Sequence, residues 1–274
     1  MAEKKLLKCS ILDPTGNITA LVESPVEIAH QPSVAQKIMA LYPQVEQVGF
    51  LRPGNGEELP ELRMAGGEFC GNASMSAAAL LASQNGKTAM RLRVSGAAEP
   101  VELMLAQDRE NSWIVEILMP PALEIIMRAF SFDELQGDLP FVRMEGISHV
   151  IIEPNSGFFR LLHERGTAER AVRAFCESLR ADGLGLMFLE GEGSNRKLTP
   201  LVYVPVSETT FWENACASGS AATGMYLAAK ARAARELALR EPGGTLWVKS
   251  DPHSGETRLK GHVRLAECTE ISFN

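Results

Sequence analysis

The chain has 274 residues, of which 45% are hydrophobic and 22% are charged, and its formal net charge is −7. These proportions are typical of a globular protein and exclude an intrinsically disordered chain. The acidic balance, with no basic run longer than Lys4 and Lys5, argues against nucleic acid as a partner. No apolar run approaches the roughly 18 residues that span a bilayer, and the N-terminus lacks a signal-peptide stretch, so we expect a cytoplasmic protein with no membrane partner.

In chain order, the first half predicts a mixed set of strands and helices. Strands are expected at 7–11, 18–22, 45–51 and 59–64, with a short helix at 33–41. A second helix follows Cys70 and should end near Asn85 and Gly86, a good C-terminal signal. Antiparallel strands at 88–94, 100–105 and 113–119 come next. Pro120 and Pro121 then break the pattern and mark a domain boundary.

The second half repeats this order. A strand is expected at 142–153, an amphipathic helix at 167–181, and strands at 186–189 and 201–206. Cys176 falls on the apolar side of that helix and should be plain core. A helix beginning at Cys216 is predicted to run to about Arg240, before Pro242. Strands at 246–250, 257–265 and 270–273 complete the chain.

Four pairs of landmarks relate the two halves. The offsets are 146 − 16 = 130 for two glycines, 188 − 50 = 138 for two Phe-Leu pairs, 200 − 60 = 140 for two prolines and 216 − 70 = 146 for two cysteines. The offset grows steadily, as an internal duplication with small insertions requires. We therefore expect an α+β fold of two pseudo-symmetric domains, 1–119 and 120–265, each with an antiparallel sheet wrapped around a central helix.

The cysteines are the candidate reactive residues of this chain. Cys9, Cys70, Cys176, Cys216 and Cys268 are an odd number with no CxxC pair, so neither a disulfide framework nor a zinc site is indicated. The five histidines show no ligand spacing, and we expect no metal.

Cys70 should lie in the first turn of its helix, where unpaired N–H groups and the helix dipole favour a thiolate and lower the cysteine pKa. Taken alone, this stretch is explained more simply by a buried structural cysteine. The layout recurs at Cys216, however: a glutamate shortly before the cysteine, small polar residues after it, then an alanine-rich helix. A two-fold arrangement would let both helix starts converge on one interdomain cleft, where small ligands usually bind.

Two thiols facing each other across a small-molecule site suit proton transfer at a carbon. One thiolate would remove the Cα proton of an amino acid while the other thiol donates a proton to the opposite face. Backbone N–H groups of Gly71, Asn72, Ala217 and Ser218 would stabilise the charge that builds on the substrate carboxylate. Neither GxGxxG nor GxxxxGK[ST] is present and no pyridoxal-type lysine stands out, so no cofactor is expected.

Segments 70–73 and 215–219 resemble the two cysteine motifs of the diaminopimelate epimerase family, amino acid racemases that work without pyridoxal phosphate. The likeness covers nearly the whole chain. Asn17 resembles the family's N-terminal substrate asparagine, Gln47 the glutamine of its early strand, and 242–244 its late glycine turn. The resemblance implies a homodimer and a C-terminal strand, 266–274, that returns to the first domain.

Departures from the family pattern bear on the substrate. Glu208 matches a substrate-binding glutamate, but Thr209 stands where the family has the arginine that holds a distal carboxylate. Segment 146–149 likewise replaces a family asparagine with Ile147. A second substrate carboxylate would then be buried without partners, at a cost of several kcal/mol, which disfavours diaminopimelate.

The sequence is more similar to the histidine racemases of opine-type metallophore biosynthesis. Segments 13–19, 46–50 and 68–73 look like that subgroup, and Phe211, Trp212 and Glu213 are the most telling. An aromatic pair beside a carboxylate suits a planar or cationic side chain; Trp212 could equally pack against the second of the two cysteine helices. Ala217 departs from the glycine expected after the second cysteine.

The leading hypothesis is a cofactor-independent racemase of a single-centre amino acid, best matched by histidine, with Cys70 and Cys216 as acid and base. A rival of the same class is racemisation or epimerisation of diaminopimelate, a basic amino acid or hydroxyproline. Thiol redox chemistry between the two cysteines and a non-enzymatic metabolite-binding protein are the alternatives from other classes.

Overall fold

The computed structural model describes residues 5–55 and 57–273, so the outermost residues of the predicted domains, 1–4 and 274, lie outside it. The first half contains β1 (Lys5–Pro14), β2 (Thr19–Val22), η1 (Ile28–His30), α1 (Gln31–Leu41), β3 (Gln47–Arg52), β4 (Glu61–Met64), α2 (Gly71–Asn85), β5 (Ala89–Val94), β6 (Val101–Arg109) and β7 (Ser112–Leu118). The second half contains β8 (Glu124–Phe132), β9 (Leu135–Arg143), β10 (Ser148–Ile152), η2 (Gly157–His163), α3 (Arg165–Leu179), β11 (Leu184–Glu190), β12 (Arg196–Val204), β13 (Thr209–Trp212), α4 (Ala217–Ala231), β14 (Arg235–Glu241), β15 (Gly244–Ser250) and β16 (Thr257–Phe273).

Strand pairing repeats along the chain, as a duplication predicts. In the first half β2 pairs in parallel with β3, β3 antiparallel with β4, and β4 in parallel with β5. In the second half β10, β11, β12 and β14 pair in the same three ways. The helices fall at matching points: α1 and α3 join the first parallel pair of each half, and α2 and α4 join the second. The fold is therefore α+β with a repeated topology; the boundary at 120 stays a prediction.

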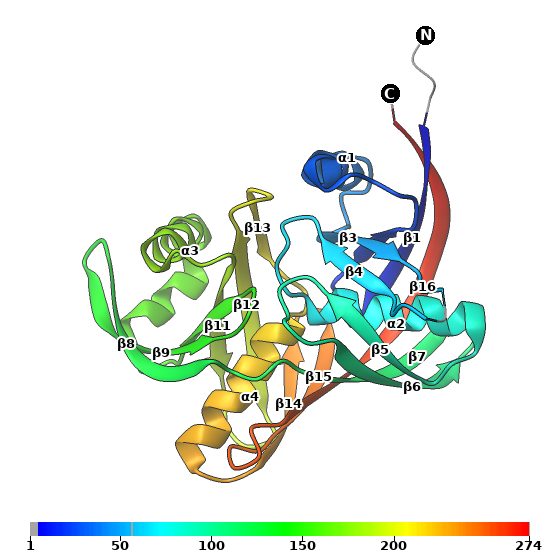
Figure 1. The fold of residues 1–274 in the computed structure, drawn as a ribbon. Coiled ribbons are helices and arrows are strands. Elements are labelled where there is room, and N and C mark those ends of the chain that lie inside the picture. The colour runs from blue at the N-terminus through cyan, green and yellow to red at the C-terminus, as the bar shows by residue number, and fades with distance from the viewer. Residues whose placement is uncertain (1–4, 56, 274) are drawn as a thin grey trace.

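Each half of the sheet wraps around one helix (Figure 1). Every residue of α2 from Gly71 to Ala82 is buried, because the strands of the first half surround the helix. Small Ala and Ser side chains let those strands approach closely, and a helix buried all round carries no amphipathic stripe. The helix ends at Gly86, which has a left-handed φ of 72° and donates its N–H to Ala82, as the sequence predicted.

β16 connects the two halves. Its first part pairs with β15 and β7, and the segment from Val263 to Phe273 pairs antiparallel with β1. The predicted strands at 257–265 and 270–273 are thus one continuous strand, which returns to the start of the chain, and β1 and β16 run side by side in Figure 1.

The predicted extent of the Cys216 helix is wrong. The helix ends at Ala231, Arg232 takes a left-handed conformation with φ 53°, and 235–241 forms β14. Leu237, Leu239 and Glu241 are buried on alternate residues, which is the two-residue period of a strand. Helix-forming composition misled the prediction, because pairing of β14 with β15 overrides local propensity.

A hairpin absent from the sequence prediction lies after the two prolines. β8 and β9 pair over their whole length around a tight turn at Asp133, and the expected strand 142–153 is broken at Gly146 into β9 and β10. β8 is mostly exposed, so it lacks the regular alternation that marks a half-buried strand.

The helix α3 agrees with its prediction, because Phe175 and Cys176 lie in the core beneath it.

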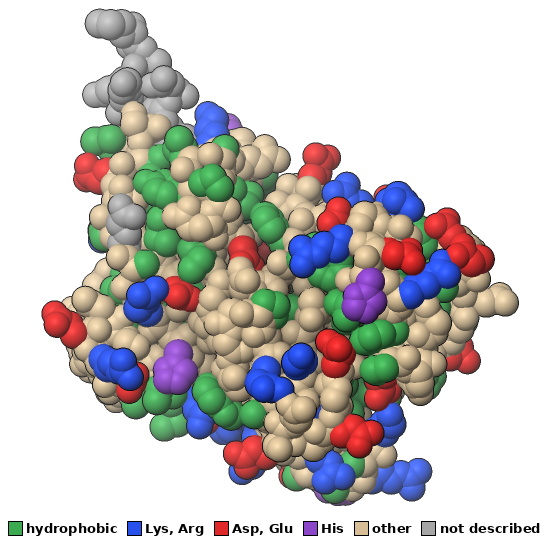
Figure 2. Space-filling view, turned by 180° about the vertical axis from the view of Figure 1, so that it is seen from behind, with side chains coloured by type: hydrophobic (Ala, Val, Ile, Leu, Met, Phe, Trp, Pro, Cys, Tyr) green, Lys and Arg blue, Asp and Glu red, His purple; other side chains and the backbone are tan. Residues whose placement is uncertain are grey.

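On the face shown in Figure 2, Lys and Arg alternate with Asp and Glu and leave no broad field of one sign. Within the described part of the chain, no helix combines the length and apolarity needed to cross a membrane.

Candidate active site

The N-termini of α2 and α4 meet, and each begins at a cysteine. Cys70 and Cys216 are the two N-cap residues. A Cβ added to Gly71 would lie 2.8 Å from the Cβ of Ala217, so the two helices touch at their first residues. Both cysteines line one cavity of about 30 Å³, together with Gln47, Glu68, Phe69, Gly71, Asn72, Ile147, Val202, Val204, Glu213, Ala217 and Ser218. Seven of the eight substrate-binding residues predicted beside the cysteines lie at or next to this cavity.

Two of these eight residues, Asn17 and Glu208, do not line the cavity itself. Asn17 does not line the cavity but lies directly behind it, bonded to the residue before Cys216. Glu208 lies elsewhere: it is exposed in the β12–β13 turn with a φ of 54°, and it is absent from the cavity wall.

The sulfur of Cys70 caps its own helix. It accepts the N–H of Ala73 at 3.4 Å, and the thiol donates to Oε1 of Gln47 at 2.9 Å. Gln47 is held in turn by Thr19, whose Oγ1 accepts its Nε2 at 2.8 Å. Burial is the largest influence and raises the pKa of Cys70, the Ala73 N–H lowers it, and the charges of Glu213 and Glu68 raise it. The predicted lowering of this pKa is wrong, because burial and two carboxyls outweigh the helix N–H groups.

The sulfur of Cys216 is placed differently. It is 3.6 Å from Oγ of Ser218 and caps no helix N–H, while its own backbone N–H donates to Oε2 of Glu241 at 2.7 Å. Burial raises the pKa of Cys216 well above the usual value, and the neighbouring charges of Glu213 and Glu241 raise it further.

Two asparagines from the first half hold the backbone before Cys216. Nδ2 of Asn17 and Nδ2 of Asn72 each donate to the carbonyl oxygen of Ala215 at 2.7 Å. Both residues are buried, and neither Oδ1 has a hydrogen-bond partner among the described residues. The first half of the chain therefore positions the second cysteine.

Backbone crossings fix the two halves beside this site. A Cβ on Gly16 would lie 2.5 Å from Cα of Gly243, and a Cβ on Gly146 would lie 2.5 Å from Cα of Gly96. Gly16 and Gly146 both have positive φ, 93° and 70°, and occupy equivalent turns of the repeat. Only glycine fits such close approaches in that conformation.

Three carboxyls gather on one side of the cleft. Glu46 accepts the backbone N–H of Asn214 at 3.1 Å and also its side-chain amide. Burial raises the pKa of Glu46 to about 7 and that of Glu213 to about 8, where the charge of Glu46 adds to the effect. Burial also raises the pKa of Glu68, whose Oε2 has no partner in the described part of the chain.

A second pocket of about 40 Å³ continues the cavity and shares Gln47, Glu68, Val202, Val204 and Glu213 with it. Thr209 and Phe211 line it because alternate residues of β13 face the same side, and Glu213, the residue after the strand, continues this alternation. Trp212 faces the other way: it stacks on Phe188 at 5.7 Å and donates Nε1 to Glu169 of α3 at 3.0 Å. Trp212 therefore packs on β11 and α3, and it is absent from the walls of both cavities.

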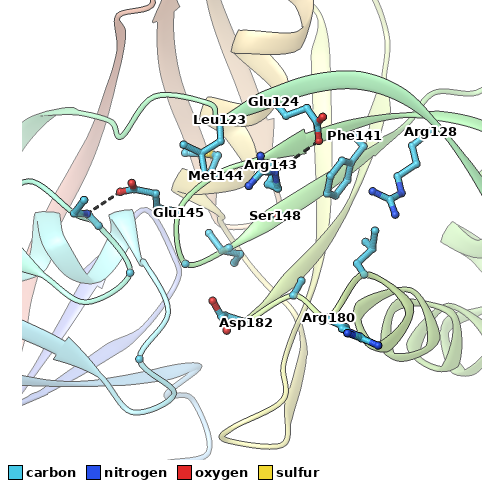
Figure 3. A pocket seen from close by; sticks show the side chains of 18 residues that line it. Leu123, Glu124, Arg128, Phe141, Arg143, Met144, Glu145, Ser148, Arg180 and Asp182 are labelled. Carbon is cyan, nitrogen blue, oxygen red and sulfur yellow. Dashed lines mark hydrogen bonds and ion pairs between the residues drawn. The ribbon is translucent and has the colours of Figure 1, made fainter.

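The cysteine cavity and its neighbour each hold only a few waters by the usual volume criterion. A much larger cavity of about 640 Å³ lies outside them and shares only Ile147 with the cysteine cavity. Figure 3 shows its charged rim, where Arg143 faces Glu124 at 3.6 Å and Glu145 accepts the N–H of Ala98 at 2.7 Å. Arg128, Arg180 and Asp182 add both signs of charge and no thiol. Size alone therefore does not identify the candidate active site.

Sequence reasoning missed Glu46 and Glu241 as members of this site. Glu241 was placed just beyond a helix predicted to reach about Arg240, but that helix ends at Ala231, and no local pattern links Glu241 to Cys216. Among the described residues no group of three or more His, Cys, Asp and Glu side chains is arranged to hold a metal ion.

Comparison with known proteins gives consistent matches. The family model of the histidine racemase CntK N-terminal domain matches residues 6–269. A histidine racemase of Fusobacterium nucleatum subsp. nucleatum is 30% identical over 93% of this chain and 92% of its own length, and one of Staphylococcus aureus is 27% identical over 95% of each. A hydroxyproline epimerase from Agrobacterium vitis, solved with bound trans-4-hydroxy-L-proline, superposes with a TM-score of 0.70 at 13% identity, covering 100% of this chain and 93% of that one. That last likeness concerns the fold.

Proposed function

The chain belongs to the histidine racemase family, and from that premise we propose that it interconverts L- and D-histidine with Cys70 and Cys216 as an acid–base pair. The observation that carries the proposal is the meeting of two helix starts, each with a cysteine at its N-cap, on one cavity. Inversion at Cα needs a base on one face and an acid on the other. Two thiols from opposite halves of a repeated fold supply that pair.

In the forward direction one thiolate takes the Cα proton and the other thiol gives its proton to the opposite face. The substrate is then inverted and the two sulfurs have exchanged protonation states. Charge that develops on the substrate carboxylate is stabilised by the free N–H groups at the two helix starts, including those of Gly71 and Ala217. Both cysteine pKa values are raised before substrate binds. The substrate ammonium, an opposite charge next to the thiols, lowers them and favours the reactive thiolate.

The acidic side of the cleft supports histidine as the substrate. Glu68 and Glu213 line both the cysteine cavity and its neighbour, and Glu46 lines the neighbour. Carboxyls can accept the N–H groups of an imidazole, and Phe211 offers an aromatic face for the planar ring. We expect Glu213→Gln to raise the KM for histidine about 10-fold, with a smaller effect on kcat, because the charge-assisted bond to the ring is lost.

The test is turnover in deuterium oxide with a panel of amino acids. L-histidine should give D-histidine that carries deuterium at Cα, measured by NMR and chiral chromatography. Hydroxyproline, lysine, arginine and diaminopimelate are the matched comparisons, and faster inversion of any of these would replace histidine as the substrate. Inversion of histidine by the double variant Cys70→Ser/Cys216→Ser would contradict the mechanism.

We also propose a cytoplasmic homodimer that acts in the biosynthesis of an opine-type metallophore. A reducing compartment keeps the two thiols free, and no disulfide joins the cysteines that the structure describes. The dimer and the pathway are supported by the family likeness, and light scattering of the purified chain tests the dimer directly.

A further inference from the structure

Glu241 is a buried carboxyl that the mechanism above does not use. It ends β14 just before the turn at Pro242, and it is 7% exposed. Its Oε2 accepts the backbone N–H of Cys216 at 2.7 Å, and its Oε1 accepts the hydroxyl of Ser220 in the first turn of α4. A carboxyl buried to this degree needs such donors, since an unpaired one would be costly.

The turn that follows Glu241 holds the same segment from another side. The N–H of Gly243 donates to the carbonyl oxygen of Asn214 at 2.7 Å. Ala215 is held by Asn17 and Asn72, and Cys216 by Glu241. Three consecutive residues before α4 are therefore each fixed by a hydrogen bond to their backbone, and the last of the three carries the reactive sulfur.

We propose that Glu241 is a positioning residue for Cys216: it anchors the cysteine backbone so that the sulfur lines the cavity, and once ionised its carboxylate opposes loss of the proton from that sulfur. The proposal rests on the acid–base function above. At Cys70 the sulfur itself caps the helix through the N–H of Ala73. At Cys216 the sulfur makes no such cap, and a carboxyl from β14 binds the start of the helix instead.

The charged groups around Cys216 determine the direction in which Glu241 shifts the pKa of the thiol. Glu213 precedes it on the chain, Glu241 faces it from β14, and Ser218 contacts its sulfur. Across the cavity lie Cys70 and Glu68, while Glu46 acts on Glu213. Burial raises the pKa of Glu241 to about 8, against the lowering effect of its bonds to Ser220 and Cys216. Cys216 titrates higher, so Glu241 is already ionised where the thiol would lose its proton, and the like charge opposes that loss.

The test compares Glu241→Gln with Glu241→Ala. Glutamine keeps an oxygen for the Cys216 N–H and removes the charge. The ionisation of Cys216 is read from ultraviolet thiolate absorbance, as the difference between Cys70→Ser and Cys70→Ser/Cys216→Ser proteins. When Glu241→Gln is added to the two titration proteins, we expect the midpoint of Cys216 ionisation to fall by about one pH unit. In the enzyme that carries Glu241→Gln alone, the alkaline limb of the kcat profile should also move to lower pH. Glu241→Ala, which also loses the anchor, should lower kcat about 10-fold or more with little change in KM.

Glu153→Gln is the matched control. Glu153 also bonds to α4, through Tyr226 at 2.8 Å and Lys230, but at the far end of the helix. It should leave the Cys216 midpoint and the kcat profile unchanged. An unshifted midpoint in Glu241→Gln would overturn the proposal, and this readout remains if Glu241→Ala fails to fold. Because the thiolate titration needs no turnover, it is independent of whether histidine is the substrate.

Discussion

Cys70 and Cys216 each occupy the N-cap of a 15-residue helix, with φ of −133° and −129°. The backbone of the repeat is thus preserved at both cysteines, while the polar groups around them differ. The sulfur of Cys70 is bonded to the N–H of Ala73 and to Gln47, whereas Cys216 has a carboxyl on its backbone and a serine hydroxyl at its sulfur. Duplication gives two thiols at equivalent positions, and divergence gives them different hydrogen-bond partners.

The difference extends to the strands beneath. Thr19 and Gln47 are paired residues of β2 and β3, and the equivalent pair in β10 and β11 is His149 and Gly185. A Cβ on Gly185 would lie 2.5 Å from Nδ1 of His149, so the imidazole fills the space that a side chain would take. Neither ring nitrogen of His149 has a partner among the described residues, and burial lowers its pKa to about 3. The first half therefore presents hydrogen-bonding groups where the second presents a neutral ring.

Replacing each cysteine in turn should have the largest effect. Cys70→Ser and Cys216→Ser should each lower racemisation about 10³-fold, because inversion needs both groups. The remaining thiol can still exchange the Cα proton of one enantiomer, so the two variants should deuterate opposite enantiomers of histidine. Chiral chromatography with mass detection measures both effects, and Cys268→Ser, at an exposed position, is the control. Exchange of the same enantiomer by both variants would refute opposed faces.

Gly71→Ala should break the contact between the two helix starts. The added Cβ would lie 2.8 Å from that of Ala217, so the helices must separate, and we expect kcat to fall about 10-fold or more and the melting temperature to drop by several degrees. Adding Ala217→Gly makes room and should restore most of both quantities. If the second substitution restored neither quantity, the clash with Ala217 would not be the cause of the loss.

Gln47→Leu should weaken the Cys70 side alone. It removes the acceptor of the Cys70 thiol and leaves Oγ1 of Thr19 without its donor. We expect kcat to fall about 5-fold to 10-fold, with stability reduced by about 1 kcal/mol in urea unfolding. Ser218→Ala, which removes the hydroxyl beside Cys216, is the counterpart on the other side. Equal effects of the two substitutions on the pH profile would show that the different hydrogen bonds at the two thiols do not affect catalysis.

Besides its effect on KM, Glu213→Gln should change the stability of the folded protein, and this change is the smallest of the expected effects. The pKa of Glu213 is raised in the folded protein to about 8, so the native state binds a proton more tightly than the unfolded state. Stability therefore falls as pH rises from about 4.5 to 8. Glutamine removes this loss, and we expect the variant to gain about 2 °C in melting temperature at pH 8 relative to pH 5. Calorimetry of both proteins at the two pH values checks the sign.

Local patterns were enough to place the cysteine helices, their repeat and most strands, because Cys70 and Cys216 carry the same layout of small residues. They were not enough for Glu241, since the alternation of Leu237 and Leu239 was hidden within a helix-forming composition. The direction of the Cys70 pKa also depended on burial, which only the assembled sheet provides. Trp212 was resolved by strand alternation once β13 was in place.

The glycine crossings have a consequence for access to the cleft. Gly16 meets Gly243 and Gly96 meets Gly146, with no room for a side chain at either point. Two fixed points define a line, and a rigid opening that keeps both contacts is a rotation about that line. An opening that widens the cavity between the thiols and keeps both contacts would therefore turn about an axis set by four residues without side chains.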